Sequence, residues 1–126
     1  MNTKHVPDVE LCQEFDRLCK EKNITLPETE FYWSLIDEKT NHWGVEEDRG
    51  IGDQIPAPLV SEQGEWLSEG IEQTWKRSGN RNWVVLFSPI TGDGTYQPIE
   101  KEADTEASAR QKMINHLIAE GIITTL

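Results

Sequence analysis

The apolar residues of this chain follow a helical period near both ends and an alternating period in the middle. Residues 8–22 and 104–120 place apolar side chains at helical spacing. Between them, residues 30–37, 71–77 and 82–88 are rich in aromatic and branched side chains, which is typical of strands. The pattern therefore predicts two long helices that flank a set of strands.

The strongest of these strands is residues 82–88, whose nearly continuous apolar run favours burial on both faces and a central place in a sheet. Asp93 and Gly94 then predict a tight hairpin turn. We expect residues 96–99 to return as an edge strand, because Pro98 cannot donate a ladder hydrogen bond. A further short strand is expected around residues 43–45.

A short helix is predicted after the Ile-Pro-Ala-Pro segment at residues 55–58. Ser61 is a favourable N-cap, and Gly70 is expected just past the C-terminus. Trp66 and Leu67 should face inward, and Trp66 should anchor a helix that is too short to be stable by propensity alone.

The order of these elements predicts an α+β fold: a small antiparallel sheet with the N-terminal and C-terminal helices packed on one face and a short middle helix. A chain of 126 residues is expected to form a single domain over residues 1–126, with residues 1–7 frayed. We expect one core to hold the apolar residues of both helices and two strands, namely Phe15, Leu18, Trp33, Leu35, Val84, Leu86, Ile114 and Leu117.

The charge of the chain limits its possible partners. It carries 23 acidic and 12 basic residues, a formal net charge of −11, spread over both halves of the sequence. Such a surface repels the phosphates of nucleic acids and the headgroups of anionic membranes, so neither is an expected partner. No apolar run approaches the roughly 18 residues of a membrane span. The N-terminus also lacks an apolar signal region, so a cytoplasmic location is expected.

The cysteines, histidines and acidic residues of this chain do not form a known catalytic or metal-binding motif. Cys12 and Cys19 lie on one helix face, about two turns apart and too distant for a disulfide. His5, His42 and His116 lack the regular spacing of metal ligands. The acidic segment around residues 46–53 could hold calcium in principle, but solvated charge explains it better. We expect no catalytic residue, no metal and no cofactor, and hence no enzyme.

One cluster combines basic and aromatic residues. Trp75, Lys76, Arg77 and Arg81 lie close together in the sequence, with Trp83 nearby. Stacked aromatics and basic residues can bind single-stranded nucleic acid, but three charges offset little of a net charge of −11. The same charges can instead protect the exposed face and edge of a hairpin. These four residues are the possible partner surface of the chain.

Three segments of the chain form a pattern that occurs in this order in other small proteins. The first is the aromatic strand at residues 31–33, and the second runs from Ile55 to Leu67. The third is a closing segment with an Ala-Arg-x-Lys-Met core, from Glu102 to Ile123. In these segments the chain resembles a family of small uncharacterised proteins encoded by phages and prophages of gut anaerobes. The resemblance implies a genomic setting but no activity, and no functional residue is carried over from it.

These observations favour a non-enzymatic accessory or binding protein of a phage or mobile element, acting through contacts with an unknown protein partner. One alternative is an acidic DNA mimic that inhibits a nucleic-acid-binding protein, which requires carboxylates aligned along one extended face. Another is a small enzyme with an unrecognised site, which requires a deep pocket holding titratable groups with shifted pKa values.

Overall fold

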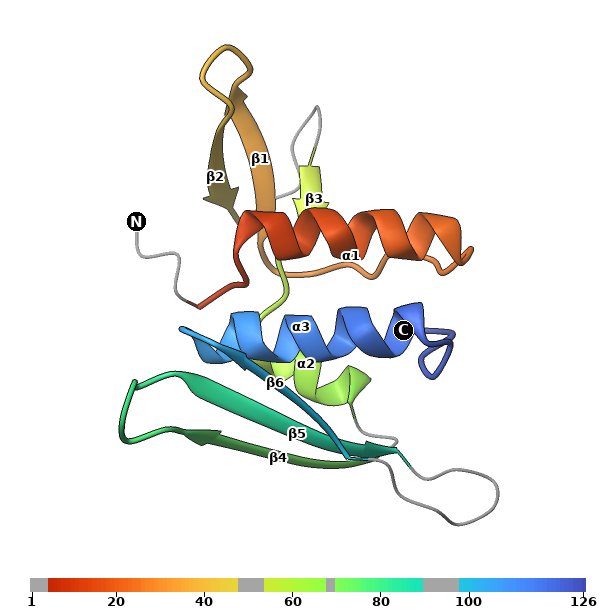
Figure 1. The fold of residues 1–126 in the computed structure, drawn as a ribbon. Coiled ribbons are helices and arrows are strands. Elements are labelled where there is room, and N and C mark those ends of the chain that lie inside the picture. The colour runs from red at the N-terminus through yellow and green to blue at the C-terminus, as the bar shows by residue number, and fades with distance from the viewer. Residues whose placement is uncertain (1–4, 48–53, 68–69, 90–97) are drawn as a thin grey trace.

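Two long helices lie side by side between two small antiparallel sheets (Figure 1). In this computed structural model, helix α1 (Val9–Glu21) contacts helix α3 (Glu106–Ala119). The α+β class and the contact between the terminal helices are confirmed, while the strands divide between two three-stranded sheets where a single sheet was expected. The described residues are 5–47, 54–67, 70–89 and 98–126.

The first sheet has the order β2-β1-β3 and packs against the N-terminal half of α1. It consists of β1 (Tyr32–Asp37), β2 (His42–Glu46) and β3 (Gln54–Pro56). Trp33 on the central strand lies opposite Val45 on one side and Ile55 on the other, so all three point to the same face. Together with Val6 and Cys12, this face forms a separate apolar cluster.

The segment before α1 is tied to this sheet. Val6 is 1% exposed, and the indole Nε1 of Trp33 donates a hydrogen bond of 2.9 Å to the carbonyl of Pro7. The His5 ring meets the Phe31 ring edge-on, with 4.7 Å between centroids. The expected fraying of residues 1–7 therefore does not extend to residues 5–7, because their contacts bury apolar surface and a backbone acceptor; residues 1–4 lie outside the described residues.

The second sheet has the order β4-β5-β6, with the strongly apolar strand in the centre as predicted. It consists of β4 (Gly70–Lys76), β5 (Trp83–Pro89) and β6 (Ile99–Ala103). Of the strand expected at residues 96–99, Tyr96 and Gln97 lie outside the described residues; the described strand starts at Ile99, directly after Pro98, and its ladder with β5 extends to Ala103. The predicted hairpin turn at residues 93–94 lies outside the described residues.

Alternation along β5 separates residues that were expected to share one core. Val85 and Phe87 face α3 and belong to the main apolar cluster. Val84 and Leu86 point to the opposite side, since successive strand residues alternate between faces. The prediction that Val84 and Leu86 belong to the main core is therefore wrong. Four of the other expected core residues, Phe15, Leu18, Ile114 and Leu117, do share that cluster, whereas Trp33 belongs to the cluster of the first sheet.

Helix α2 (Val60–Trp66) starts two residues earlier than predicted, with Leu59 at the N-cap and Ser61 inside the first turn. The Glu62 carboxylate accepts a hydrogen bond of 2.8 Å from the Leu59 backbone N–H, which holds the start of the helix. Its end at Trp66 precedes the expected stop at Gly70, which belongs to β4.

Two apolar residues dock α2 onto the main cluster. Trp66 is half-buried and stacks on Phe15, with 5.7 Å between ring centroids. Leu67, just after the helix, is 1% exposed. The expected anchoring by Trp66 is therefore shared with Leu67, which is the more deeply buried of the two.

Three buried amides connect the helices to one another. The Gln63 amide nitrogen of α2 donates to the carbonyl of Ala107 at 2.9 Å and to the Gln111 amide oxygen at 3.0 Å, both on α3. Gln111 donates in turn to Asn115 at 2.9 Å, and Asn115 donates to the carbonyl of Leu11 on α1 at 3.0 Å. The chain of bonds thus runs from α2 through α3 to α1.

Helix α3 ends at a glycine in the left-handed conformation. Gly121 has a φ of 75°, and its N–H donates to the carbonyl of Ile118 at 3.1 Å. The N–H of Ile122 donates to the carbonyl of Leu117 at 2.8 Å, which completes a Schellman motif. Asn23, with a φ of 57°, ends α1 in the same way.

The conformation of Gly121 predicts the effect of adding a methyl group there. Gly121→Ala should lower the free energy of unfolding by roughly 1 kcal/mol, because an L-residue is strained in the left-handed region. Gly79→Ala is the matched control, since a Cβ at Gly79 would meet nothing within 4 Å and its φ is not positive. Urea unfolding of both variants measures the difference, and equal losses of stability would contradict the assigned helix end.

Candidate functional site

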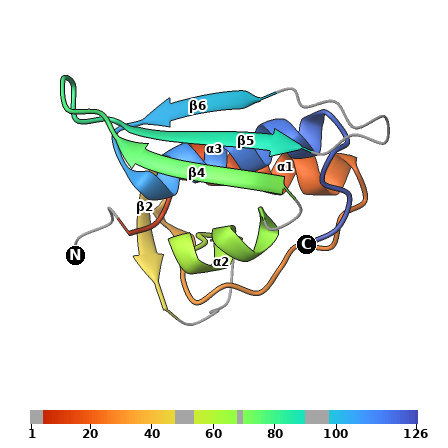
Figure 2. The same ribbon diagram turned by 90° about the horizontal axis from the view of Figure 1, so that it is seen from below.

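The side of the β4-β5-β6 sheet that points away from α3 carries an exposed tryptophan. Figure 2 views this side, with α1 and α3 behind the strands. Trp75 lies opposite Val84, which lies opposite Glu102, so the three side chains share this face. Trp75 is 38% exposed. We call this side the outer face; by register it carries Gln73, Trp75, Val84, Leu86, Glu100 and Glu102.

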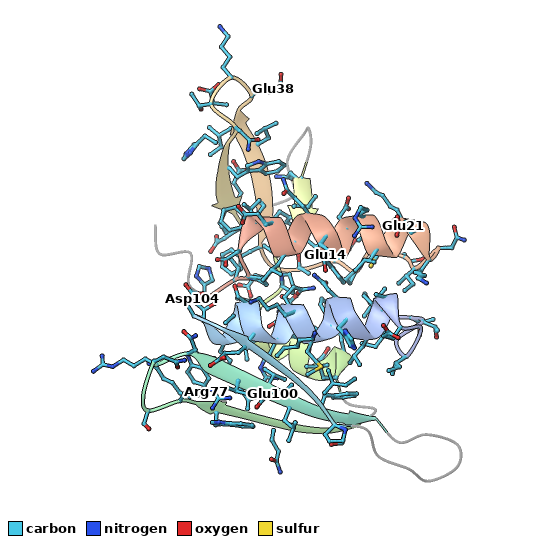
Figure 3. All side chains as sticks on the ribbon, viewed as in Figure 1. Glu14, Glu21, Glu38, Arg77, Glu100 and Asp104 are labelled. Carbon is cyan, nitrogen blue, oxygen red and sulfur yellow. The ribbon has the colours of Figure 1, made fainter. Side chains whose placement is uncertain are left out.

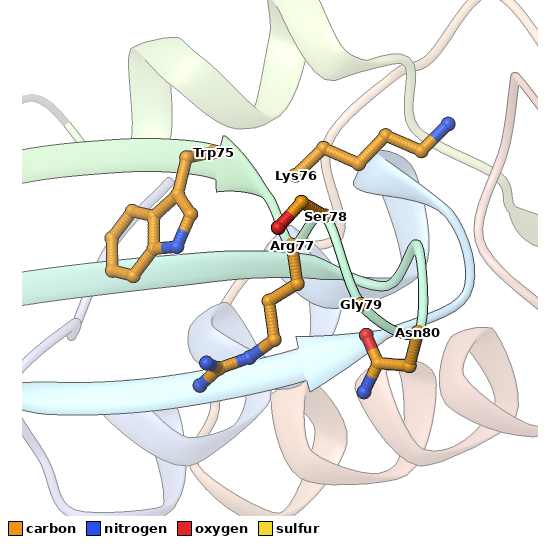
Figure 4. Close-up of a pocket in the computed structure, with 6 residues that line it drawn as sticks. All are labelled: Trp75, Lys76, Arg77, Ser78, Gly79 and Asn80. Carbon is orange, nitrogen blue, oxygen red and sulfur yellow. The ribbon is translucent and has the colours of Figure 1, made fainter.

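Arg77 joins the two edge strands across the outer face. It follows β4 in the chain, yet its Nε lies 2.8 Å from a carboxylate oxygen of Glu102 on β6. Its Nη2 lies 3.5 Å from Glu100 on the same strand. The side chain therefore crosses the central strand beside Trp75 (Figure 4), which explains why Val84 is fully buried on a face turned away from the helices.

Lys76 lies on the other side of the sheet, away from Trp75 (Figure 4). Its Nζ lies 5.9 Å from the centroid of the Trp83 ring, a distance at which a cation is attracted to an aromatic face. Trp83 in turn packs against the main apolar cluster. The predicted basic and aromatic cluster is thus divided by the sheet: Trp75 and Arg77 share the outer face, whereas Lys76 covers Trp83 on the inner side.

Arg81 lies in the exposed turn between β4 and β5. This turn is closed by a 2.8 Å hydrogen bond from the Arg77 N–H to the carbonyl of Asn82. Its left-handed residue is Arg81, with a φ of 59°, rather than Gly79. Beside the turn, residues 75–80 line an open concavity of about 470 Å³, so three of the four predicted surface residues border it and Arg81 does not.

Glu100 and Glu102 belong to this surface but were not predicted as part of it. Both lie on β6, where glutamates alternate with Ile99, Lys101 and Ala103. That alternation is the period of a strand with one face toward the core, so it could have identified the strand from the sequence. Pairing with Arg77 could not have been identified in this way, because it depends on the order of strands in the sheet.

The two thiols are buried and unreactive in character. Burial raises the pKa of the Cys12 thiol well above its usual range and raises that of Cys19 to about 11. Both thiols are therefore protonated near neutral pH, and a protonated thiol is a poor nucleophile. Within the described ranges, no group of three or more His, Cys, Asp or Glu side chains could hold a metal ion. Asp48 and Asp53 of the acidic segment lie outside those ranges.

We expect thiol reagents to leave the folded protein unmodified. Cys12 and Cys19 are each 0% exposed, and their protonation adds a chemical barrier to the steric one. With an aromatic disulfide reagent at pH 8, the native protein should release no coloured thiolate from the reagent over several minutes. The denatured protein should release two equivalents, one for each cysteine. Rapid release of one equivalent from the native protein would show that one thiol is accessible.

Comparison with protein-family models, with curated proteins and with solved structures gives no match for this chain. Among the helices of the described residues, none has both the length and the apolar character needed to cross a membrane.

Proposed function

We propose that this protein is a non-enzymatic binding protein that acts through contacts with another protein, and that the outer face around Trp75 and Arg77 is its contact surface. The observation that carries this proposal is the exposure of Trp75 on the outer face. Tryptophan and arginine are the residue types most enriched among those that dominate binding energy at protein interfaces.

The composition of the outer face supports a protein partner. Trp75 and the half-buried Leu86 supply apolar surface, while Glu100, Glu102 and Arg77 surround it with charges. An apolar centre within a polar rim is the usual arrangement of a protein interface. Because Arg77 is held by two carboxylates, its guanidinium is already oriented before a partner arrives.

The distribution of carboxylates favours this proposal over DNA mimicry. Figure 3 shows Glu38 at the tip of the β1–β2 hairpin, Glu21 near the end of α1, and Glu100 on the opposite sheet. A mimic needs carboxylates in a row on one extended face, so that they can replace phosphates in a basic cleft. Scattered carboxylates instead keep an acidic domain soluble.

The position of the shifted titratable groups favours binding over catalysis. The pKa values of Asp8, Cys12 and Cys19 are raised, in each case mainly by burial. None of these three residues lines the concavity beside Trp75. An enzyme would be expected to place its shifted groups in its pocket.

We further propose that the protein belongs to a phage or mobile element and works in a reducing compartment. The resemblance of the segments between residues 31 and 123 supports an accessory role in a phage or mobile element. Two buried, unpaired cysteines support a reducing compartment such as the cytoplasm.

Truncation of the exposed tryptophan tests the proposal. A partner is first isolated by affinity capture from the host and then purified, so that its affinity for each variant can be measured by calorimetry. Trp75→Ala should weaken binding by about thirtyfold, as expected for a residue that contributes about 2 kcal/mol. Ile36→Ala is the matched control, because Ile36 is also exposed, at 59%, but lies on the other sheet.

The melting temperature of each variant is measured alongside, so that loss of fold is not mistaken for loss of contact. Equal affinities of the parent protein and the Trp75→Ala variant for the partner would overturn the assignment of the outer face. If Ile36→Ala lowers the affinity for the partner more than Trp75→Ala does, the contact surface lies on the β1–β2 hairpin instead.

We also expect weak binding to nucleic acids. A net charge of −11 repels phosphates within about a Debye length, roughly 8 Å at physiological salt. Electrophoretic shift of random duplex and single-stranded DNA should show no complex below micromolar protein. Sub-micromolar binding that weakens steeply with added salt would contradict a protein partner as the main ligand.

A further inference from the structure

A groove on the opposite side of α3 from α2 brings together charged side chains from two helices and a strand. It lies where α1 and α3 run side by side next to β6, the arrangement seen from the front in Figure 1. Its volume is about 380 Å³, within the range of sites for small molecules. The charged or titratable residues that line it are Glu14 of α1, Lys112 and His116 of α3, and Lys101 of β6.

Lys101 is the unusual member of this set. It is half-buried, and within the described ranges no carboxylate lies within ion-pair distance of its ammonium group. In a chain with 23 acidic residues, other cations such as Arg77 and Arg110 do pair with glutamates. A lysine ammonium without a counter-charge is available to bind an anion, and an anion in the groove would supply the missing charge.

Lys112 supplies a second ammonium group to the groove. Its Nζ donates a hydrogen bond of 2.8 Å to the backbone carbonyl of Glu102, at the free edge of β6. This bond goes to a neutral acceptor, and the Asp8 carboxylate also attracts the Lys112 ammonium. His116 lies four residues further along α3 and therefore on the same side of the helix, where it adds a hydrogen-bond donor to the groove.

The floor of the groove is rigid. Asn115 is 1% exposed, and its amide is held on both sides, by Gln111 as donor and by the carbonyl of Leu11 as acceptor. These bonds join α1 to α3 beneath the groove. A ligand that binds above a fixed floor has to order few protein groups, which favours affinity.

From this geometry we infer that the groove between α1, α3 and β6 binds a small dianion, such as a phosphate ester or a dicarboxylate, through Lys101, Lys112 and His116. Two ammonium groups match two negative charges, and lysine binds phosphate as a point charge. Glu14 lines the same groove from α1, and its repulsion of any anion limits the expected affinity to the millimolar range. This site is separate from the outer face and does not depend on the proposed protein partner.

The test uses inorganic phosphate and succinate as probes on the full chain at pH 7, with sodium chloride adjusted to constant ionic strength. Amide chemical shifts are followed by NMR during each titration. Saturable shifts at residues around Lys101, Lys112 and His116, at millimolar probe, are the expected result. Lys101→Gln should weaken binding about tenfold, because it removes one charge-assisted hydrogen bond.

Lys39→Gln is the matched control, because Lys39 is exposed at the tip of the β1–β2 hairpin and its loss changes the net charge by the same amount. It should leave the affinity unchanged. If Lys101→Gln alters the fold, Lys112→Gln replaces it in the comparison. Saturation with phosphate alone would identify the ligand as a phosphate ester, and saturation with both probes would identify a general dianion site.

Either of two results would overturn the inference. One is the absence of saturable shifts with both probes, which would mean that Lys101 only covers apolar surface with its methylene stem. The other is an equal loss of affinity in the Lys101 and Lys39 variants, which would mean that the anions respond to net charge rather than to the groove.

Discussion

The structure depends on the burial of α3 between α1, α2 and the second sheet. Nine residues along this helix are buried, and they lie on more than one side of it. Its apolar side faces Val85 and Phe87, while Gln111 and Asn115 point toward the other helices. Buried amides without partners would cost several kcal/mol, so their mutual hydrogen bonds, with Gln63 and the carbonyl of Leu11, require the three helices to adopt one arrangement.

The same arrangement gives the second sheet two unlike faces. With α3 against one side, the alternation of β5 assigns Val85 to the core and Val84 to the outer face. The outer face then has to bury Val84 with its own side chains, and it does so with Trp75 and with the Arg77 side chain that reaches β6. Trp75 is left partly exposed as a result. The surface proposed for partner binding is thus a consequence of how a single-layer sheet covers its central strand.

The proposed anion groove depends on the other side of α3. There Asn115 joins α1 to α3, and Lys112 binds the free edge of β6 through the carbonyl of Glu102. Glu102 is therefore shared: its backbone meets the groove through Lys112, and its carboxylate meets Arg77 on the outer face. The two candidate surfaces are on different sides of the molecule but are connected through one residue of an edge strand.

The sequence by itself determined the local features of this protein. Helical spacing identified α1 and α3, and the apolar run identified β5 as the central strand. These features depend on periodicity, which short segments encode. The division into two sheets, the separation of Lys76 from Trp75, the burial of Gln63, Gln111 and Asn115, and the pairing of Arg77 with β6 were decided only by the tertiary structure. Each of these depends on which distant segments come into contact, and a polar residue reveals its burial only when its hydrogen-bonding partner is in place.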